Sequence, residues 1–301
     1  MPQGIHCMKI HEALTRAESL LEEAACPNPR LDAEYLLQFS LGVNRCFLAT
    51  HPHDDLELLK EDSFFAWIRK RSEGMPVQYI VGRQEFRGME FEVNRHVLIP
   101  RPETELLVEE ALSSMSETAT TLVDVGTGSG CVAVVAAVER PGMRIIATDV
   151  SEHALEVACR NARRHGVAGR IQFLKGDLLE PLIAGTEDVK VDCVCSNPPY
   201  VAERDLPSLQ REVRDWEPRI ALAAGENGLR VIERLVPQAL TVLKPGGILA
   251  MEIGYNQQEK VIELFKDGWK TVRVREDFSG IPRIVVAEKM STFVADRYDR
   301  L

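Results

Sequence analysis

The sequence predicts an α/β protein with a doubly wound, mostly parallel sheet, preceded by a small helical bundle and a connecting β-hairpin. Three observations lead to this fold class. Apolar residues recur at helical spacing through residues 1–84, they alternate with polar residues through 85–99, and short apolar runs alternate with helical stretches through 100–301. The last pattern is typical of parallel sheets covered by helices. We therefore expect an N-terminal helical domain, a hairpin linker and a larger α/β domain over these three ranges.

The first 84 residues predict three helices. An amphipathic stripe runs from Ile10 to Ala24. A second helix is expected from about Leu31 to Leu41 and a third from Asp54 to Ser72, each followed by a glycine that favours helix termination. This unit carries nine Lys and Arg against twelve Asp and Glu. It therefore lacks the positive excess that phosphate binding requires.

The rest of the chain predicts a hairpin and then alternating strands and helices. The hairpin is expected to turn at Asn94 and Arg95. Pro102 favours the start of a helix, and Ser151 is a candidate N-cap for another that runs to His165. The expected strands are Thr121–Val125, Arg144–Asp149, Ile171–Leu174, Val191–Ser196 and Ile248–Ile253, followed by an edge hairpin of Thr271–Arg275 and Arg283–Ala287.

The composition of the 301 residues excludes several classes of protein. The net charge of -10 disfavours a large nucleic-acid interface. No apolar run approaches the ~20 residues of a membrane helix, and Met1–Lys9 lacks the apolar core of a secretory signal. The seven scattered cysteines include no CxxC pair, which disfavours a zinc or other metal site. Cys193 and Cys195 share one face of a strand, and we expect free thiols in a reducing cytoplasm.

The first candidate site is the glycine-rich turn Asp-Val-Gly-Thr-Gly-Ser-Gly at residues 124–130. Glycines permit a tight turn and a close approach of the backbone to a ligand. The spacing differs from the GxGxxG of pyrophosphate binders, and no GK[ST] follows, which excludes a P-loop. Alone, the turn is also compatible with a purely structural role. The candidate ligand contacts in it are Gly126, Thr127, Gly128, Ser129 and Gly130.

The second candidate is Asp149, at the end of the next predicted strand. A carboxylate at this place can accept hydrogen bonds from both hydroxyls of a ribose. The alternative is an aspartate that merely flanks the helix capped by Ser151. Beside the glycine-rich turn, the ribose interpretation is favoured.

The third candidate is Asn197-Pro198-Pro199-Tyr200, directly after the predicted strand Val191–Ser196. Prolines restrict the backbone and remove two donors, which leaves a rigid loop with free carbonyls. The Asn197 oxygen and the Pro198 carbonyl suit the two protons of a planar NH2 group, and Tyr200 could pack on its flat face. The alternative is a plain turn with the asparagine as a helix cap. The position beside the other two candidates favours a binding role.

These three candidates together resemble the class I S-adenosylmethionine-dependent methyltransferases that modify planar nitrogens. Two further stretches make the resemblance more specific. Residues 76–82 read Pro-Val-Gln-Tyr-Ile-Val-Gly, and residues 98–105 read Leu-Ile-Pro-Arg-Pro-Glu-Thr-Glu. With the helical N-terminus, they resemble the PrmC/HemK family of protein-(glutamine-N5) methyltransferases over about residues 8–288. Asn-Pro-Pro-Tyr alone is shared with DNA adenine-N6 methyltransferases.

The resemblance implies S-adenosyl-L-methionine as cofactor, S-adenosyl-L-homocysteine as product, and the glutamine of a Gly-Gly-Gln motif in peptide chain release factors as substrate. A leucine stands at position 178, where an aromatic side chain would stack on adenine. Glu103 lies in the first turn of a predicted helix, where a negative charge stabilises the helix dipole whether or not the side chain contacts a ligand. By resemblance, the catalytic residues are Asn197, Pro198 and Tyr200, and the substrate is bound by these three together with Pro199. Further cofactor contacts are Glu103, Thr104, Asp177, Leu178 and Asn197.

Two other functions stay open from the sequence. A nucleic-acid adenine-N6 methyltransferase would flip a base into the same pocket, although the acidic charge disfavours it. A noncatalytic S-adenosylmethionine-binding scaffold would not need the intact motif set. We therefore expect a monomeric enzyme that docks a release factor on its N-terminal helices and makes no stable contact with nucleic acid or a membrane.

Overall fold

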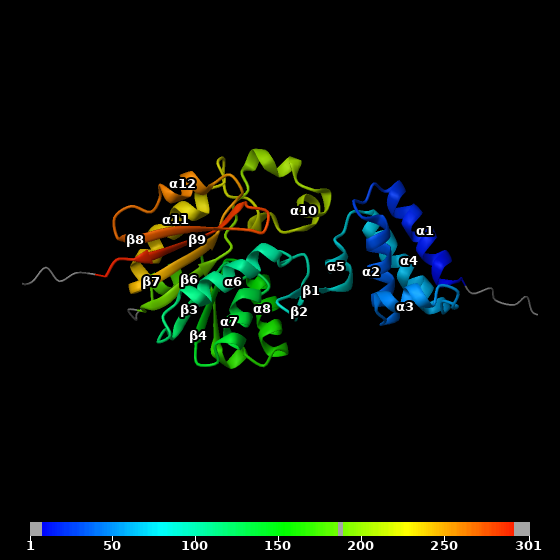
Figure 1. The fold of residues 1–301 in the computed structure, drawn as a ribbon, viewed down its shortest axis with the longest axis horizontal. Helices are drawn as coiled ribbons and strands as arrows, with labels where there is room; N and C mark the ends of the chain where they lie inside the picture. The colour runs from blue at the N-terminus through cyan, green and yellow to red at the C-terminus, as the bar shows by residue number, and fades with distance from the viewer. Residues whose placement is uncertain (1–7, 186–188, 292–301) are drawn as a thin grey trace, which may run out of the picture. The chain divides into compact units, whose positions relative to one another are not determined.

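The structure, a computed structural model, describes residues 8–185 and 189–291 (Figure 1). The chain divides into two compact units. One comprises Met1–Arg83 with Leu209–Trp216, and the other comprises Gln84–Ser208 with Glu217–Leu301. The segment Leu209–Trp216 thus belongs to the helical unit, although it lies within the range predicted for the larger domain. The N-terminus up to residue 7, including Cys7, and the tail from residue 292 lie outside the described residues.

The helical unit contains the three predicted helices together with short ones that the apolar pattern did not predict. Its helices are α1 (Ile10–Glu23), α2 (Pro29–Leu41), α3 (Arg45–Thr50), α4 (Leu58–Ser72), α5 (Val77–Val81) and α10 (Arg211–Trp216). The third predicted helix begins four residues late, because α3 and a loop precede it. The Asn44 side chain caps α3 by accepting a hydrogen bond from Phe47 N at 3.0 Å. A helix of this length shows too few turns for its period to be recognised.

Two arginines explain why the segment Leu209–Trp216 folds with the helical unit. The guanidinium of Arg71, which is only 3% exposed, binds the carboxylates of Asp32 and Glu212, each at 2.7 Å. Arg211 donates to the backbone carbonyl of Glu73 at 2.9 Å. A buried arginine needs such partners, since an unpaired buried charge is costly.

The larger unit is built on the predicted sheet, whose seven strands lie in the order β5-β4-β3-β6-β7-β9-β8. The pairings from β5 to β7 are parallel, whereas β9 is antiparallel to both β7 and β8. This confirms the predicted doubly wound, mostly parallel fold. The strands are β3 (Thr121–Val125), β4 (Arg144–Asp149), β5 (Ile171–Lys175), β6 (Val191–Ser196), β7 (Leu243–Glu252), β8 (Trp269–Glu276) and β9 (Pro282–Lys289).

The predicted hairpin exists, but its turn was placed wrongly. Strands β1 (Arg83–Phe86) and β2 (Met89–Glu92) are joined at Arg87 and Gly88, not at Asn94 and Arg95. Both linking residues have positive φ angles, 50° and 71°. Two-residue hairpins favour such angles because they match the twist of the strands.

Helices cover both faces of the sheet (Figure 1), and an apolar core lies on each face. Helices α6 (Pro102–Ser114), α7 (Cys131–Glu139) and α8 (Glu152–Arg164) contribute to the core on one face. Helices α9 (Glu180–Ile183), α11 (Arg230–Val242) and α12 (Gln258–Ile262) contribute to the core on the other. Cys193 and Cys195 face the first of these cores together, as their spacing predicts, and the six cysteines in the described residues are free thiols. Within residues 8–185 and 189–291, no helix combines the length and apolarity needed to cross a membrane.

Candidate active site

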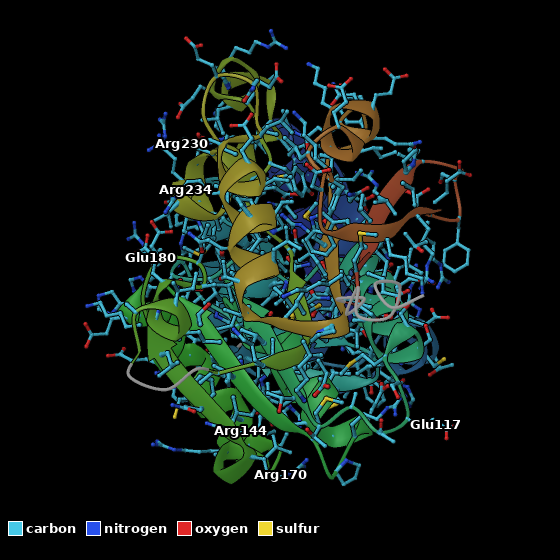
Figure 2. The ribbon with its side chains drawn as sticks, turned by 90° about the vertical axis from the view of Figure 1, so that its left-hand side faces the viewer. Glu117, Arg144, Arg170, Glu180, Arg230 and Arg234 are labelled. Atoms are coloured by element: carbon cyan, nitrogen blue, oxygen red, sulfur yellow. The ribbon has the colours of Figure 1, made fainter. Side chains whose placement is uncertain are left out.

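The candidate site is a cavity of about 360 Å³ in the larger unit, at the carboxyl ends of the central strands. Strands β4 and β5 lie to one side of β3, whereas β6 and β7 lie to the other, so the strand order reverses between β3 and β6. Open α/β sheets bind ligands at such a point. Figure 2 labels Arg144 and Arg170 at the opposite end of this unit, away from Arg230 and Arg234. The cavity lining includes residues from all three candidate motifs.

The glycine-rich turn is held by the buried carboxylate of Asp124. This carboxylate accepts hydrogen bonds from Thr127 Oγ1 at 2.6 Å and from Ala133 N at 3.2 Å. Burial raises the pKa of Asp124 to about 7. Gly126 and Gly128 have positive φ angles and line the cavity. The turn therefore presents backbone groups to the cavity in a fixed shape.

Gly130 is not among the residues that line the cavity. A Cβ at this position would lie 2.9 Å from the Cβ of Ala158. Real side chains do not approach this closely, so the glycine lets the start of α7 pack directly against α8. Its role in this structure is the close packing of two helices.

Asp149 joins the glycine-rich turn to the start of α8. One carboxylate oxygen accepts from Gly128 N at 2.9 Å and the other accepts from Ser151 N at 2.8 Å. Ser151 caps the helix, as predicted, by accepting from Ala154 N. Burial raises the pKa of Asp149. Each carboxylate oxygen has further acceptor capacity, and the side chain lines the cavity, which suits a ligand with two adjacent hydroxyls.

Asp177 and Leu178 line the cavity after β5. Leu178 has a φ of 52°, a conformation that is uncommon for residues with a side chain. The Asp177 carboxylate binds Arg234 of α11 at 2.7 Å, and the same guanidinium lies 3.3 Å from Glu180. Figure 2 shows Arg230 and Arg234 along the same side of α11, with Glu180 below them. This ion pair fixes the rim of the cavity beside Leu178.

The Asn-Pro-Pro-Tyr loop is held by two residues that are distant in sequence. Asn197 Nδ2 donates to Thr104 Oγ1 at 2.9 Å, and Thr104 Oγ1 donates to Glu252 Oε2 at 2.8 Å. The Tyr200 hydroxyl donates to Glu252 Oε1 at 3.1 Å. Glu252 is 1% exposed, and burial raises its pKa to about 7. Glu252 was not predicted from the sequence, where its only signal is a charged residue near the end of an otherwise apolar run.

The other residues of this loop contribute differently to the site. Asn197 and Pro199 line the cavity, whereas Pro198 and Tyr200 are not among the lining residues. Burial, together with the Glu252 carboxyl that accepts its hydrogen bond, raises the pKa of the Tyr200 hydroxyl. Tyr200 is therefore a neutral donor that anchors the loop. Its predicted stacking on a planar substrate stays a prediction.

The start of α6 places Thr104 in the cavity wall but not Glu103. Glu103 lies in the first turn of the helix, where its charge complements the dipole. Arg101 lines the cavity and its guanidinium binds the buried Glu217 at 2.6 Å. The resemblance already implies that Arg101 lies beside the cofactor pocket, but its partner Glu217 was not predicted, since the contact spans 116 positions.

Comparison with known proteins gives matches over nearly the whole chain. Residues 12–82 match the PrmC N-terminal domain, and residues 102–212 match the methyltransferase small domain. The release factor glutamine methyltransferase of Koribacter versatilis is 43% identical over 283 residues, which cover 94% of this chain and 99% of that protein. The enzyme of the same name from Nitratidesulfovibrio vulgaris is 41% identical, covering 92% and 94% of the two chains.

A solved structure supports the fold independently. The crystal structure of a methyltransferase from Pyrococcus furiosus superposes with a TM-score of 0.51 at 19% identity. The match covers 68% of this chain and 91% of that one. At this level of identity, the likeness concerns the fold.

Proposed function

The chain belongs to the release factor glutamine methyltransferase family, and we propose that its cavity directs methylation to the side-chain nitrogen, N5, of the glutamine in the Gly-Gly-Gln motif of release factors. The enzyme is an S-adenosylmethionine-dependent methyltransferase. The observation that carries the proposal is the Asn197 amide, whose nitrogen is bound to Thr104 in the wall of the cavity. Its oxygen accepts no hydrogen bond within residues 8–185 and 189–291, so it is free for a substrate.

Several features of the cavity fit S-adenosylmethionine. A Cβ added at Gly126 would have no atom of the described residues within 4 Å. A Cβ added at Gly128 would lie 3.9 Å from the backbone oxygen of Gly126, so the space in front of both glycines is open. Asp149 keeps acceptor capacity for ribose hydroxyls. Leu178 offers an apolar surface for adenine in place of an aromatic ring. We propose that Thr127, Ser129 and Asp177 complete the surroundings of the cofactor, and that Gly130 and Glu103 contribute through the elements they hold. Thr104 and Asn197 border the same space, where they act on the substrate.

The chemical difficulty of the reaction is that an amide nitrogen is a poor nucleophile, because its lone pair is delocalised into the carbonyl. S-adenosylmethionine supplies an electrophilic methyl group on a sulfonium. We propose that Asn197 Oδ1 and the Pro198 carbonyl accept the two N–H groups of the glutamine. Acceptors at these places orient the nitrogen and stabilise the positive charge that develops on it. Orientation alone accounts for much of the rate in reactions of this kind.

We also propose that the helical unit docks the protein substrate and that the enzyme works as a cytoplasmic monomer without stable nucleic-acid contacts. The free thiols suit a reducing compartment. The net charge of -10 opposes binding to polyphosphate chains. Analytical ultracentrifugation at micromolar concentration tests the oligomeric state directly.

The function is tested by transfer of a radiolabelled methyl group from S-adenosylmethionine to purified release factor. Two matched substrates are compared, one with Gly-Gly-Gln and one in which alanine replaces that glutamine, with adenine-containing DNA as a third. We expect label on the first substrate alone. Label on DNA would instead support an adenine-N6 methyltransferase, and cofactor binding with no transfer to any substrate would support a noncatalytic scaffold.

A further inference from the structure

A buried chain of hydrogen bonds leads away from the proposed acceptor, Asn197. It runs from Asn197 Nδ2 to Thr104 Oγ1 and from Thr104 Oγ1 to Glu252 Oε2, at 2.9 and 2.8 Å. The other oxygen of Glu252 accepts the hydroxyl of Tyr200 at 3.1 Å. Thr104 and Glu252 are 2% and 1% exposed. The three elements that meet here are the start of α6, the loop after β6 and the end of β7.

The direction of this chain follows from the number of protons available. A threonine hydroxyl has one proton to donate, and Thr104 gives it to the carboxylate. Its oxygen can then only accept from Asn197, so the amide must turn its NH2 group toward Thr104. The Asn197 oxygen then lies on the side of the amide away from Thr104, where it is available to a substrate. Without a carboxylate at the far end, Thr104 could donate to Asn197 instead, and the amide could turn over.

We propose that Glu252 is a positioning residue for methyl transfer, because through Thr104 it sets the Asn197 amide with its oxygen available to the substrate, and through Tyr200 it anchors the other end of the same loop. The inference rests on the proposed role of Asn197 as acceptor. Thr104 thereby acts on the acceptor, whereas the family resemblance implies a contact with the cofactor. The two roles predict different kinetic effects.

The proposal also carries a dependence on pH. An ionised Glu252 is an acceptor only and therefore takes the protons of both hydroxyls. Protonation adds a donor to one of its oxygens, so the carboxyl no longer forces Thr104 to donate. Burial raises its pKa to about 7. The groups that face it are Thr104 and Glu103 of α6, Tyr200 of the loop and Arg283 of β9, which is itself paired with Asp277 at 3.1 Å. Glu103 opposes ionisation, whereas the other three favour it. We therefore expect kcat to fall as pH drops through about 7.

The first experiment compares Thr104→Val with Thr104→Ser. Valine keeps the shape of threonine but removes the hydroxyl, so the relay is broken with little change in volume. We expect Thr104→Val to lower kcat by about 10- to 100-fold while the Kd for S-adenosylmethionine changes by less than about threefold. Thr104→Ser should recover most of the lost kcat. A large rise in Kd with unchanged kcat would assign Thr104 to the cofactor and overturn the relay.

The second experiment uses Glu252→Gln, with Glu288→Gln as the matched control. Glutamine keeps the packing, and its amide can accept from either hydroxyl or donate to it. It therefore no longer forces Thr104 to donate and no longer fixes the orientation of the Asn197 amide. Glu288 is a carboxylate on β9 that binds Lys270 at 3.1 Å and is remote from the cavity lining. We expect Glu252→Gln to lower kcat by about 10-fold and to lose the fall below pH 7. A kcat and pH profile equal to those of Glu288→Gln would overturn the proposal.

Asn197→Ala, measured in the same assay, separates this inference from the function on which it rests. If Asn197→Ala retains full label transfer, the proposed acceptor is wrong and the relay has nothing to position. If Asn197→Ala abolishes transfer but both Thr104→Val and Glu252→Gln keep the parental kcat, the acceptor role stands and only the relay fails. Thermal unfolding of each variant shows whether a lost activity reflects a lost fold.

Discussion

The two sides of the cavity are held by contacts of very different reach along the chain. On the side of the glycine-rich turn, Asp124 binds a hydroxyl three positions away, and Asp149 binds backbone amides two and 21 positions away. On the other side, Asn197 binds a residue 93 positions away, and Thr104 binds one 148 positions away. The first side is shaped largely by its own sequence, whereas the second exists only when the whole sheet is assembled.

This difference assigns a separate task to each side. The turn beside Asp149 offers backbone groups and a carboxylate, which suit binding of a cofactor. The loop beside Asn197 offers a single oriented amide oxygen, which suits placement of the reacting nitrogen. Substitutions on the first side should therefore change mainly the Kd of the cofactor, and substitutions on the second mainly kcat.

The largest effect is expected for Asn197→Ala, which removes the proposed acceptor. We expect kcat to fall by at least about 10³-fold, or about 4 kcal/mol of transition-state stabilisation. The Kd for S-adenosylmethionine should stay within about threefold of the parent, as measured by calorimetry. The result follows because the amide oxygen acts on the substrate nitrogen in the transition state.

A suitable control is Asn44→Ala, which removes an asparagine side chain that accepts a backbone hydrogen bond in the helical unit. It should cost about 1 kcal/mol of unfolding free energy without changing kcat. If Asn197→Ala instead weakens cofactor binding and leaves kcat intact, the division of tasks between the two sides is wrong.

On the opposite side, Asp149→Ala should raise the Kd for S-adenosylmethionine by about 100-fold, which corresponds to about 2.7 kcal/mol. The change removes the proposed ribose acceptor and releases the amides of Gly128 and Ser151. The kcat at saturating cofactor should fall much less. Equilibrium binding together with saturation kinetics distinguishes the two quantities.

Asp192→Ala is the matched control for Asp149→Ala. Asp192 also accepts two backbone amides, those of Thr120 and Thr121, each at 3.0 Å, and it lies near the opposite ends of the strands. Its loss should lower the melting temperature but leave the Kd unchanged. An equal rise in Kd for both variants would mean that Asp149 acts through stability alone.

The same contrast decides how much the sequence could predict. Strands β3, β4 and β6 were predicted residue for residue, because apolar runs at the centre of a parallel sheet end at glycine or polar residues. The glycine-rich turn, Asp149 and Asn197 were found because each lies at the end of such a strand or directly after it. The turn of the hairpin was misplaced, since Arg87 adopts a positive φ that arginine rarely does.

The residues that escaped prediction are those whose partners lie far away in sequence. No residue close to Glu252 in the sequence indicates that Thr104 and Tyr200 bind its side chain. Likewise, Leu209–Trp216 joins the helical unit through the ion pair between Arg71 and Glu212, which are separated by 141 positions in sequence. Such contacts are created by topology, so no local pattern predicts them.

The local side of the cavity can be perturbed through Gly130→Ala. The new Cβ would lie 2.9 Å from that of Ala158, in a backbone conformation with a φ of 80°. Gly166→Ala is the matched control, because its φ is 71° and no atom lies within 4 Å of the Cβ position. We expect Gly130→Ala to lower the unfolding free energy by about 2 kcal/mol more than Gly166→Ala. Urea unfolding measures the difference, and equal losses would show that α7 and α8 can separate without cost.

The smallest effect is expected for Tyr200→Phe, which removes one of the two hydroxyls that bind Glu252. The loss of one hydrogen bond, about 1 kcal/mol, should lower kcat by about fivefold. The pH profile provides the sharper measurement. The Tyr200 hydrogen bond lowers the pKa of Glu252, so without it the pKa must rise above its present value of about 7.

The fall in kcat on acidification should therefore begin at a higher pH in Tyr200→Phe than in the parent. Tyr255→Phe is the control. It removes a hydroxyl of the same kind from the surface, because Tyr255 is 68% exposed. Its profile should match that of the parent. If the midpoint of the pH dependence of kcat stays in place or moves to lower pH in Tyr200→Phe, the carboxylate of Glu252 does not control the orientation of the Asn197 loop. Another residue would then have to hold this loop in the wall of the cavity.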